Sequence, residues 1–176
     1  MKIPLEIQRT KDPDGSINFK AVISFQDAIA DSSQSQKLIQ IQNEFAKSVR
    51  KWQSLLKERH SSRELMSNSR LMWRLADEIY LFIMTIENKG YAFVNASDAL
   101  AKELGMSQRQ LERLVQFRRY YSTVDQIAEN INWSKYIELL SIPSSETRKI
   151  CQKRILEGKI KTIKQLRAFK TSQRHR

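Results

Sequence analysis

Residues 97–116 decide the fold, and they read Ser-Asp-Ala-Leu-Ala-Lys-Glu-Leu-Gly-Met-Ser-Gln-Arg-Gln-Leu-Glu-Arg-Leu-Val-Gln. Leu100 and Leu104 are four residues apart, which places them on one buried face of a first helix. Ala101 is small, as is required where two helices cross closely. Gly105 follows where a tight turn needs a residue that tolerates positive φ. This half of the stretch therefore predicts a helix that ends in a turn at Gly105.

A second helix is expected directly after the turn. Met106 is placed to fill the elbow between the helices, and Ser107 can cap the new helix. Leu111 and Leu114 are three residues apart and should bury its inner face. Together these positions predict a helix-turn-helix whose second helix can lie in a DNA major groove. A plain helical hairpin that binds no DNA is the alternative.

The outer face of this second helix carries side chains that suit nucleic acid. Arginine can form two hydrogen bonds with guanine and glutamine with adenine, and lysine or arginine can neutralise phosphates. Glu112 is the exception, because it could accept from a cytosine amino group or simply pair with Arg109 or Arg113. The candidate DNA-binding residues of this region are Lys102, Ser107, Gln108, Arg109, Glu112, Arg113, Gln116, Arg118 and Arg119.

The chain is basic, and its excess charge lies in the second part. It has 31 Lys and Arg against 19 Asp and Glu, a net charge of +12. Residues 1–101 carry 14 basic and 12 acidic side chains, whereas residues 102–176 carry 17 and 7. This distribution favours a polyanion partner over a merely solubilising surface. We favour a phosphate clamp, with Lys161 and Lys164 as contacts, over a solvated helix face for the run Lys159, Lys161, Lys164, Arg167, Lys170, Arg174 and Arg176.

The remaining patterns predict a mainly α, multi-helix chain with a short N-terminal β-hairpin. Residues 5–9 and 17–21 alternate apolar and polar side chains, with Pro13 and Gly15 between them. Glycine and proline are scarce, at 4 and 3 residues, which favours long helices. Further helices are expected over about 64–88, over 133–140, from a start at Ser144-Ser145-Glu146 to about 156, and over 162–170.

An amphipathic helix is expected before the central helices. Its apolar side chains recur every three or four residues, which is the spacing of one helix face. We favour packing of this stripe within its own chain over a coiled coil with a second copy. The stripe consists of Leu38, Ile41, Phe45, Val49, Trp52 and Leu56.

The chain is expected to divide into four consecutive segments. These are a hairpin extension over 1–31, an amphipathic helix that could dimerise over 32–62, the helix-turn-helix domain over 63–170, and a frayed basic tail over 171–176. Trp52, Trp73 and Trp133 fall on apolar stripes and are expected in the core. For Tyr120 and Tyr121, core packing and sugar-phosphate contact are equally open.

Three segments resemble the DNA-binding domain of ParB/KorB-like partition proteins. In that family a helix-turn-helix is followed by a helix with a Leu-Ser, His-Ala and Leu-Leu pattern, and then by a Thr-Val-Arg helix start. Here Lys135-Tyr136 replaces the His-Ala pair, and residues 1–100 lack the Gly-Glu-Arg-Arg box that would indicate a CTP switch. The matching segments are Ala99–Ser107, Ile131–Leu140 with its Trp133-Ser134 and Leu139-Leu140, and Lys161–Leu166.

A second resemblance is to the helical N-terminal domain of YhcG-like proteins, in which a nuclease domain follows. It covers less than two thirds of the chain, and no segment matching that nuclease domain is present. Both resemblances imply DNA binding, and neither transfers a catalytic residue. The matching motifs are Trp73 with Asp77-Glu78-Ile79, Leu111 with Gln116-Phe117 and Tyr120-Tyr121, and Trp133–Tyr136 with Leu139-Leu140.

No motif in the sequence indicates catalysis, and no cofactor or metal is expected. Pro13-Asp14 and Glu157-Gly158-Lys159 imitate a nuclease signature, but no acidic strand lies between them to hold a metal. His60 and His175 are far apart, which argues against a zinc site or a recombinase centre. Cys151 is the only cysteine, and we expect a buried structural thiol.

The location and the partners follow from the same patterns. No signal peptide is apparent and the most apolar run, residues 79–86, is too short for a membrane span, so we expect a cytoplasmic protein associated with nucleoid or plasmid. The leading hypothesis is a homodimeric, sequence-specific double-stranded DNA-binding protein, either a transcriptional regulator or a plasmid or phage partition factor. The alternative is a non-catalytic helical adaptor of a nuclease or nucleoprotein assembly. RNA binding would use the same charge, but the sequence lacks an aromatic sheet motif of the RNA-binding type.

Overall fold

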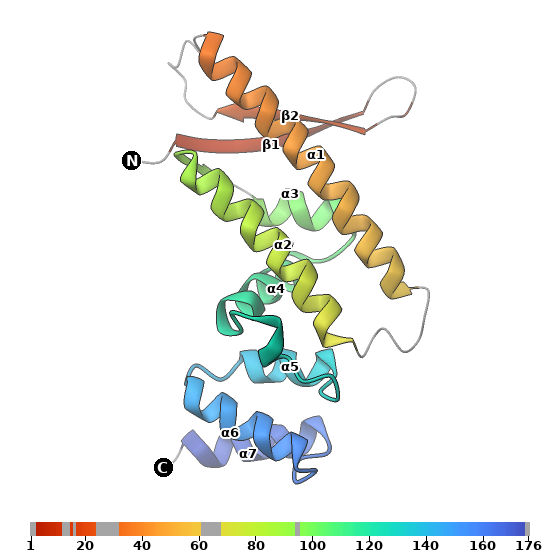
Figure 1. The fold of residues 1–176 in the computed structure, drawn as a ribbon, viewed down its shortest axis with the longest axis vertical. Coiled ribbons are helices and arrows are strands. Elements are labelled where there is room, and N and C mark those ends of the chain that lie inside the picture. Colours follow the sequence, from red (N-terminus) through yellow and green to blue (C-terminus); the bar gives the residue numbers. More distant parts are fainter. Residues whose placement is uncertain are drawn as a thin grey trace. The chain divides into compact units, whose positions relative to one another are not determined.

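The computed structural model describes residues 3–11, 15, 17–23, 32–60, 68–93 and 96–174. Within them the chain is mainly helical, with a small sheet near the N-terminus, so the predicted fold class is confirmed (Figure 1). Four predicted features lie outside the described residues. They are the turn at Pro13-Asp14, the segment boundary at residue 62, the helix start near residue 64 and the last two residues.

The described elements follow the predicted order closely. The helix expected over 133–140 has those bounds, and the next one begins within its expected start and ends at Leu156. The helix-turn-helix stretch forms two helices separated by a turn. The strands are β1 (Ile3–Lys11), β2 (Ile17–Ile23) and β3 (Tyr91–Phe93). The helices are α1 (Ser32–His60), α2 (Ser69–Asn88), α3 (Ala96–Glu103), α4 (Gln108–Tyr120), the 3-10 helix η2 (Val124–Gln126), α5 (Trp133–Leu140), α6 (Ser145–Leu156) and α7 (Ile163–Arg174).

The chain forms two compact units, and each combines two separate stretches of sequence. The first unit contains residues 1–56 and 78–112, and the second contains residues 57–77 and 113–176. The boundaries expected at residues 31, 62 and 170 divide the chain into consecutive segments, whereas each compact unit combines two stretches that are separate in the sequence. The four-segment division therefore stays a prediction.

The first unit contains a three-stranded sheet in the order β2-β1-β3. β1 and β2 form the predicted antiparallel hairpin, with Leu5 opposite Ile23 at its open end, and Gly15 has the expected positive φ of 85°. β3 pairs in parallel with β1, with Ile3 opposite Tyr91. The sequence patterns did not predict β3, because three residues are too few to show an alternation.

The amphipathic helix α1 packs within the first unit, as predicted. Phe45 and Trp52 have 0% of their surface exposed. The Phe45 ring lies 5.0 Å from Phe19 on β2 and 5.7 Å from Phe82 on α2, measured between ring centroids. Ile41, Val49 and Leu56 on the same helix face are also buried.

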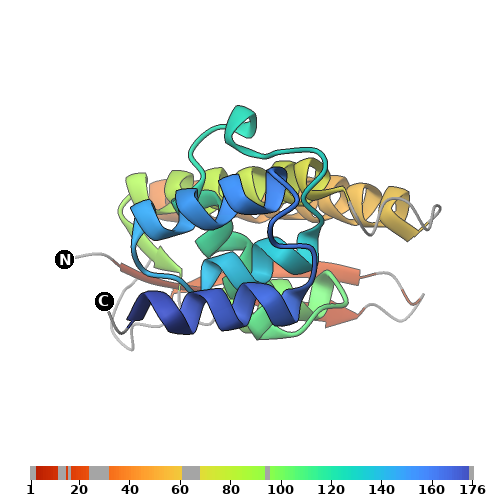
Figure 2. The same cartoon turned by 90° about the horizontal axis from the view of Figure 1, so that it is seen from below.

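The second unit contains the short helices α5, α6 and α7, which pack on one another (Figure 2). Two of them begin at side-chain caps, since Asn132 accepts a hydrogen bond from Lys135 N and Ser144 accepts one from Thr147 N. Gly158, with a φ of 72°, follows α6 where the sequence predicted its end. The caps and this glycine explain why the bounds were predictable.

The last helix is longer than predicted. α7 continues to Arg174, so the expectation of a frayed tail from residue 171 was wrong for residues 171–174. Neither glycine nor proline interrupts this stretch. The Thr171 hydroxyl donates to the Arg167 carbonyl and the Ser172 hydroxyl to the Phe169 carbonyl, so both side chains bond to the preceding turn of the helix.

Candidate nucleic-acid interface

The turn between α3 and α4 has the predicted local structure. Gly105 adopts a φ of 60°, and the N–H groups of Gly105 and Met106 donate to the carbonyls of Lys102 and Ala101. These two bonds form the Schellman arrangement that ends a helix at a left-handed residue. The five small or leucine side chains expected on the inner faces are all buried: Leu100, Ala101, Leu104, Leu111 and Leu114.

The start of α4 is fixed by a reciprocal cap. The Ser107 N–H donates to Gln110 Oε1 at 2.8 Å, and the Gln110 N–H donates to Ser107 Oγ at 3.3 Å. Ser107 was predicted as the cap, but the role of Gln110 was missed. The spacing Ser-x-x-Gln is the sequence signature of a capping box and was available as a signal.

The first turn of α4 presents polar side chains to solvent. Ser107, Gln108, Arg109 and Glu112 are exposed, and Arg113 is half-buried. The Gln108 amide donates to Glu112 Oε1 at 3.1 Å. Glu112 thus bonds Gln108, which was not among the partners considered from the sequence. This bond orients a glutamine and a carboxylate together on the surface of one helix.

Two candidate residues farther along α4 make structural contacts within the second unit. Arg118 forms a half-buried ion pair with Asp77, and its guanidinium lies 5.2 Å from the ring centroid of Trp73. The Gln116 amide donates to the Leu140 carbonyl at 3.2 Å. Both side chains therefore stabilise the second unit. They are weaker candidates for DNA contacts than Arg109.

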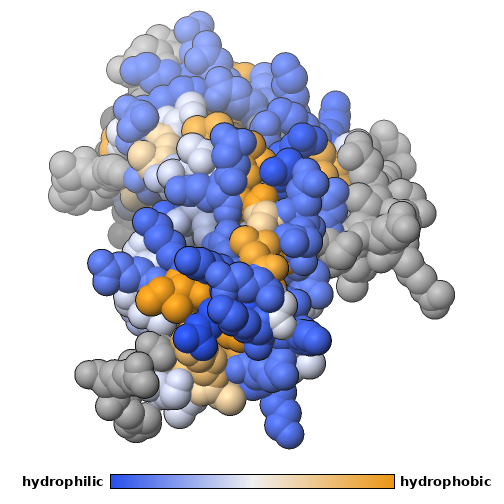
Figure 3. Space-filling view, turned by 60° about the horizontal axis from the view of Figure 1, so that its bottom comes forward, coloured by the Kyte–Doolittle hydropathy of each residue, from blue (hydrophilic) through white to orange (hydrophobic). Residues whose placement is uncertain are grey.

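The other candidate cations are exposed. These exposed side chains are Lys102, Arg119, Lys161 and Lys164. The face that Figure 3 shows is mostly hydrophilic, with smaller apolar patches between the polar side chains. Exposure of these cations fits a phosphate-contacting role and equally fits a solvated surface.

Glutamates of the second unit form ion pairs with part of the basic C-terminal run. Arg167 and Lys170 donate to Glu138 at 3.0 and 2.7 Å, and Lys159 lies 2.7 Å from Glu157. Burial would raise the pKa of Glu138, but the hydrogen bonds from Lys170 and Arg167 outweigh it and lower that pKa. Lys161 and Lys164 are therefore the better candidates for phosphate contacts in this run.

The aromatic and sulfur-containing side chains have mainly core positions. Trp52 and Trp73 are buried as predicted, and Trp133 is half-buried against Phe117, with 4.9 Å between ring centroids. Cys151 is also buried, and burial raises the pKa of its thiol. Core packing and sugar-phosphate contact were both open for Tyr120 and Tyr121. Tyr121 is buried in the core, whereas Tyr120 is half-buried.

Metal-binding clusters and membrane spans are both absent from the described residues. These residues contain no group of three or more His, Cys, Asp and Glu side chains that could hold a metal ion. They also contain no helix with the length and hydropathy of a membrane span.

No family model matches the chain, and no curated protein or solved structure matches it either. The two resemblances described above therefore stay predictions.

Proposed function

We propose that this chain is a non-catalytic, sequence-specific binder of double-stranded DNA, with the first turns of α4 as its recognition element. The observation that carries the proposal is the pair Gln108 and Arg109. Both are exposed directly after a capped turn, while Leu111 behind them is buried. Glutamine and arginine are the side chains best suited to read adenine and guanine in the major groove.

Phosphate contacts would come from the exposed cations outside this turn. Lys102 and Arg119 flank the reading residues in sequence, and Lys161 and Lys164 precede and begin α7. Such contacts supply affinity without sequence preference. A transcriptional regulator or a partition factor, associated with nucleoid or plasmid, would use this combination. A homodimer would place two reading helices on half-sites about 34–36 Å apart.

The test is the loss of discrimination when a reading side chain is removed. Arg109→Ala should cost roughly 1–3 kcal/mol on a duplex selected from a random pool and less on a scrambled duplex at the same salt concentration. Arg113→Ala should behave in the same way, because it lies one turn farther along the helix. Arg74→Ala is the matched control, since it removes an exposed arginine outside the helix-turn-helix.

Equal losses on both duplexes would mean that Arg109 touches only phosphates. Leu111→Asp marks the effect of unfolding, because it places a charge at a position that is 2% exposed. A variant that no longer binds while it keeps the wild-type circular dichroism spectrum lacks an interaction rather than its fold.

A helical adaptor is the second candidate function, and Glu112 favours it. This exposed carboxylate lies in the middle of the proposed reading face and is bonded to Gln108. A carboxylate there repels phosphates, whereas a protein partner with basic side chains would use it. If the folded wild-type protein enriches no duplex from a random pool over background, the adaptor function is favoured.

A further inference from the structure

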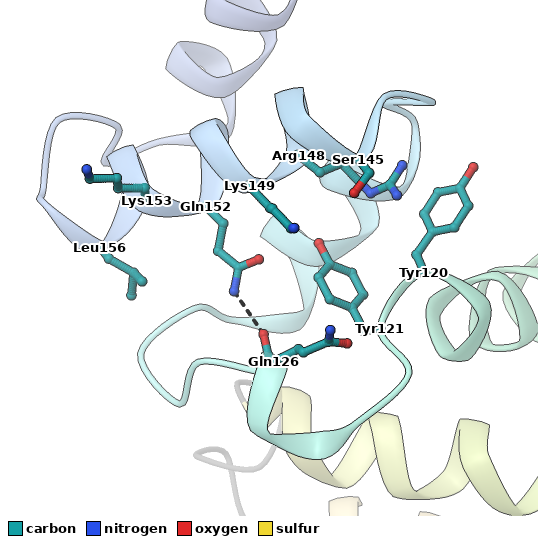
Figure 4. A pocket seen from close by; sticks show the side chains of 9 residues that line it. All are labelled: Tyr120, Tyr121, Gln126, Ser145, Arg148, Lys149, Gln152, Lys153 and Leu156. Carbon is teal, nitrogen blue, oxygen red and sulfur yellow. Dashed lines mark hydrogen bonds between the residues drawn. The ribbon is translucent and has the colours of Figure 1, made fainter.

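The second unit contains a groove that is lined by none of the candidate DNA-binding residues named above (Figure 4). It encloses about 420 Å³, within the range of roughly 300–1,000 Å³ that is usual for small-ligand sites. One wall is a single face of α6, with side chains spaced three or four residues apart. This wall consists of Ser145, Arg148, Lys149, Gln152, Lys153 and Leu156.

The opposite wall comes from the last residue of α4, the residue after it and η2. It consists of Tyr120, Tyr121 and Gln126. The Gln152 amide donates to the Gln126 carbonyl at 2.9 Å and so joins the two walls (Figure 4). This bond fixes the position of one wall relative to the other.

Arg148 is buried in the wall of the groove and is held there by backbone carbonyls. It is 7% exposed, and its Nη1 donates to the carbonyls of Ile142 and Pro143 at 2.6 and 2.8 Å. Its guanidinium carbon lies 3.8 Å from the centroid of the Tyr120 ring. Among the described residues, Nε and Nη2 of Arg148 have no hydrogen-bond partner, so the fixed guanidinium keeps donors for a ligand.

Tyr121 supplies a second unsatisfied donor. The side chain is 6% exposed, and its hydroxyl has no hydrogen-bond partner among the described residues. Figure 4 shows this hydroxyl directed towards α6, near Lys149. Buried hydroxyls are normally hydrogen-bonded, so an unpartnered one in the wall of a groove indicates a missing acceptor. Burial raises the pKa of Tyr121, which keeps the hydroxyl protonated as a donor.

The charge of the groove is of one sign. Arg148, Lys149 and Lys153 line it, and no aspartate or glutamate does. Lys153 faces Glu157 at 3.9 Å, the longest of the described ion pairs, and its side chain is 78% exposed. A surface ion pair of this length contributes little, so Lys153 keeps its capacity to bind an anion.

We propose that this groove binds a phosphate-bearing nucleotide, either free or as a unit of a single nucleic-acid strand. Lys149, Lys153, Arg148 and the Tyr121 hydroxyl would hold the phosphate, and the Tyr120 ring with the two glutamine amides would take the face and the edge of a base. Aromatic rings, amides and cations together are the usual means of holding single nucleotides. An acidic peptide would use only the cations.

The experiment measures binding to the full chain by isothermal titration at low salt. The probes are AMP, CMP, GMP and UMP, a short 5′-phosphorylated oligo(dT), adenosine and inorganic phosphate. Lys149→Gln with Lys153→Gln should weaken nucleotide binding by about tenfold or more, because two charge-assisted hydrogen bonds to the phosphate are removed. Arg74→Gln with Lys135→Gln removes the same charge from the same unit outside the groove and should change nothing.

The aromatic wall has its own pair of variants. Tyr120→Phe keeps the ring and should bind as the wild type does, whereas Tyr120→Leu should bind several-fold more weakly, since base stacking contributes roughly 1–3 kcal/mol per base. Thermal unfolding of each variant separates a weakened interaction with the nucleotide from a disrupted fold. Arg148 is left unchanged, because it also anchors the start of α6.

Binding of a mononucleotide supports the free-ligand form, and binding of the oligonucleotide alone supports the strand form. Four results would overturn the proposal. They are no binding of either probe, inorganic phosphate binding as tightly as a nucleotide, adenosine binding as tightly as AMP, and displacement of AMP by a glutamate-rich peptide at equal concentration. Arg109→Ala should leave nucleotide binding unchanged, so failure of the recognition-helix proposal and failure of this one are distinguishable.

Discussion

At the scale of single residues, the turn at Gly105 shows how one backbone conformation carries the fold. Its φ of 60° lies in the left-handed region, and a Cβ built on it would meet no other atom within 4 Å. Steric conflict with neighbours is therefore absent, and the penalty for a side chain is conformational alone. The position isolates the energetic contribution of one dihedral angle.

Gly105→Ala should lower the free energy of unfolding by about 1–2 kcal/mol, the usual cost of holding an L-residue in the left-handed region. Gly105→Asn should be less destabilising, because asparagine tolerates this conformation. Urea unfolding followed by circular dichroism gives both values. Equal stability of the alanine variant and the wild type would contradict the positive φ at this turn.

Residue identities predicted the local part of the site and missed its long-range part. The buried leucines and the Ser107 cap could be predicted, because their partners lie within a few residues. Arg118 and Gln116 could not be assigned to structural contacts, since their partners Asp77 and Leu140 are 41 and 24 residues away. Helical spacing identifies a face of a helix and says nothing of which distant group meets it.

At the scale of elements, α1 shows the strength and the limit of periodicity. The spacing predicted which face is apolar, and the contacts of Phe45 with Phe19 and Phe82 show what covers it. The stripe therefore gives no support to dimerisation through this helix, and the homodimer, which stays a prediction, would need another surface. β3 went unpredicted because a parallel edge strand of three residues depends on its neighbour β1.

Phe45→Ala should lower the free energy of unfolding by about 3–5 kcal/mol, because it leaves a cavity among buried aromatic rings. Any dependence of the unfolding midpoint on protein concentration should be the same for the variant and the wild type, because a homodimer would use a surface other than this stripe. Ile39→Ala is the control, because it lies on the same helix with 55% of its surface exposed. A concentration dependence that is present in the wild type and lost in Phe45→Ala would indicate that a second copy covers the stripe.

The attachment of α7 to α5 should depend on pH through Glu138. Its side chain is 12% exposed and accepts from Arg167 and Lys170, which together hold its pKa below the ordinary carboxyl value. A lowered pKa in the folded state contributes stability above the ordinary value, and this contribution disappears as the pH falls through the folded-state value.

Glu138→Gln should therefore lower the free energy of unfolding by about 1 kcal/mol near neutral pH and by progressively less in acid. Glu129→Gln serves as the control, because Glu129 is 75% exposed in its ion pair with Arg70, and such surface pairs contribute little. Denaturant unfolding across the acidic range gives both curves. A destabilisation by Glu138→Gln that is constant with pH would mean that its ion pairs contribute nothing.

At the scale of the whole molecule, sequence order and spatial organisation differ. Each compact unit is assembled from two stretches of chain, which a division along the sequence could not represent. The net charge of a segment, in contrast, can be counted directly from the sequence, because it is a sum over residues. Residues 102–176 carry a net +10 of the total +12. A protein with this distribution should bind polyanions with strong dependence on salt.

The last prediction separates this general attraction from contacts at defined positions. Lys161→Gln with Lys164→Gln should weaken selected and scrambled duplexes alike, and should make the slope of log K against log salt shallower by about 0.9 for each phosphate that is no longer neutralised. The reason is counterion release, which counts neutralised phosphates and ignores the bases beside them.

Arg74→Gln with Lys135→Gln provides the reference, since it lowers the net charge by the same amount at positions outside the basic run. If attraction depends only on total charge, both double variants shift affinity equally. If Lys161 and Lys164 touch phosphates, only their variant changes the slope. An identical slope for both would assign the two lysines to a solvated surface and leave α4 to account for the affinity alone.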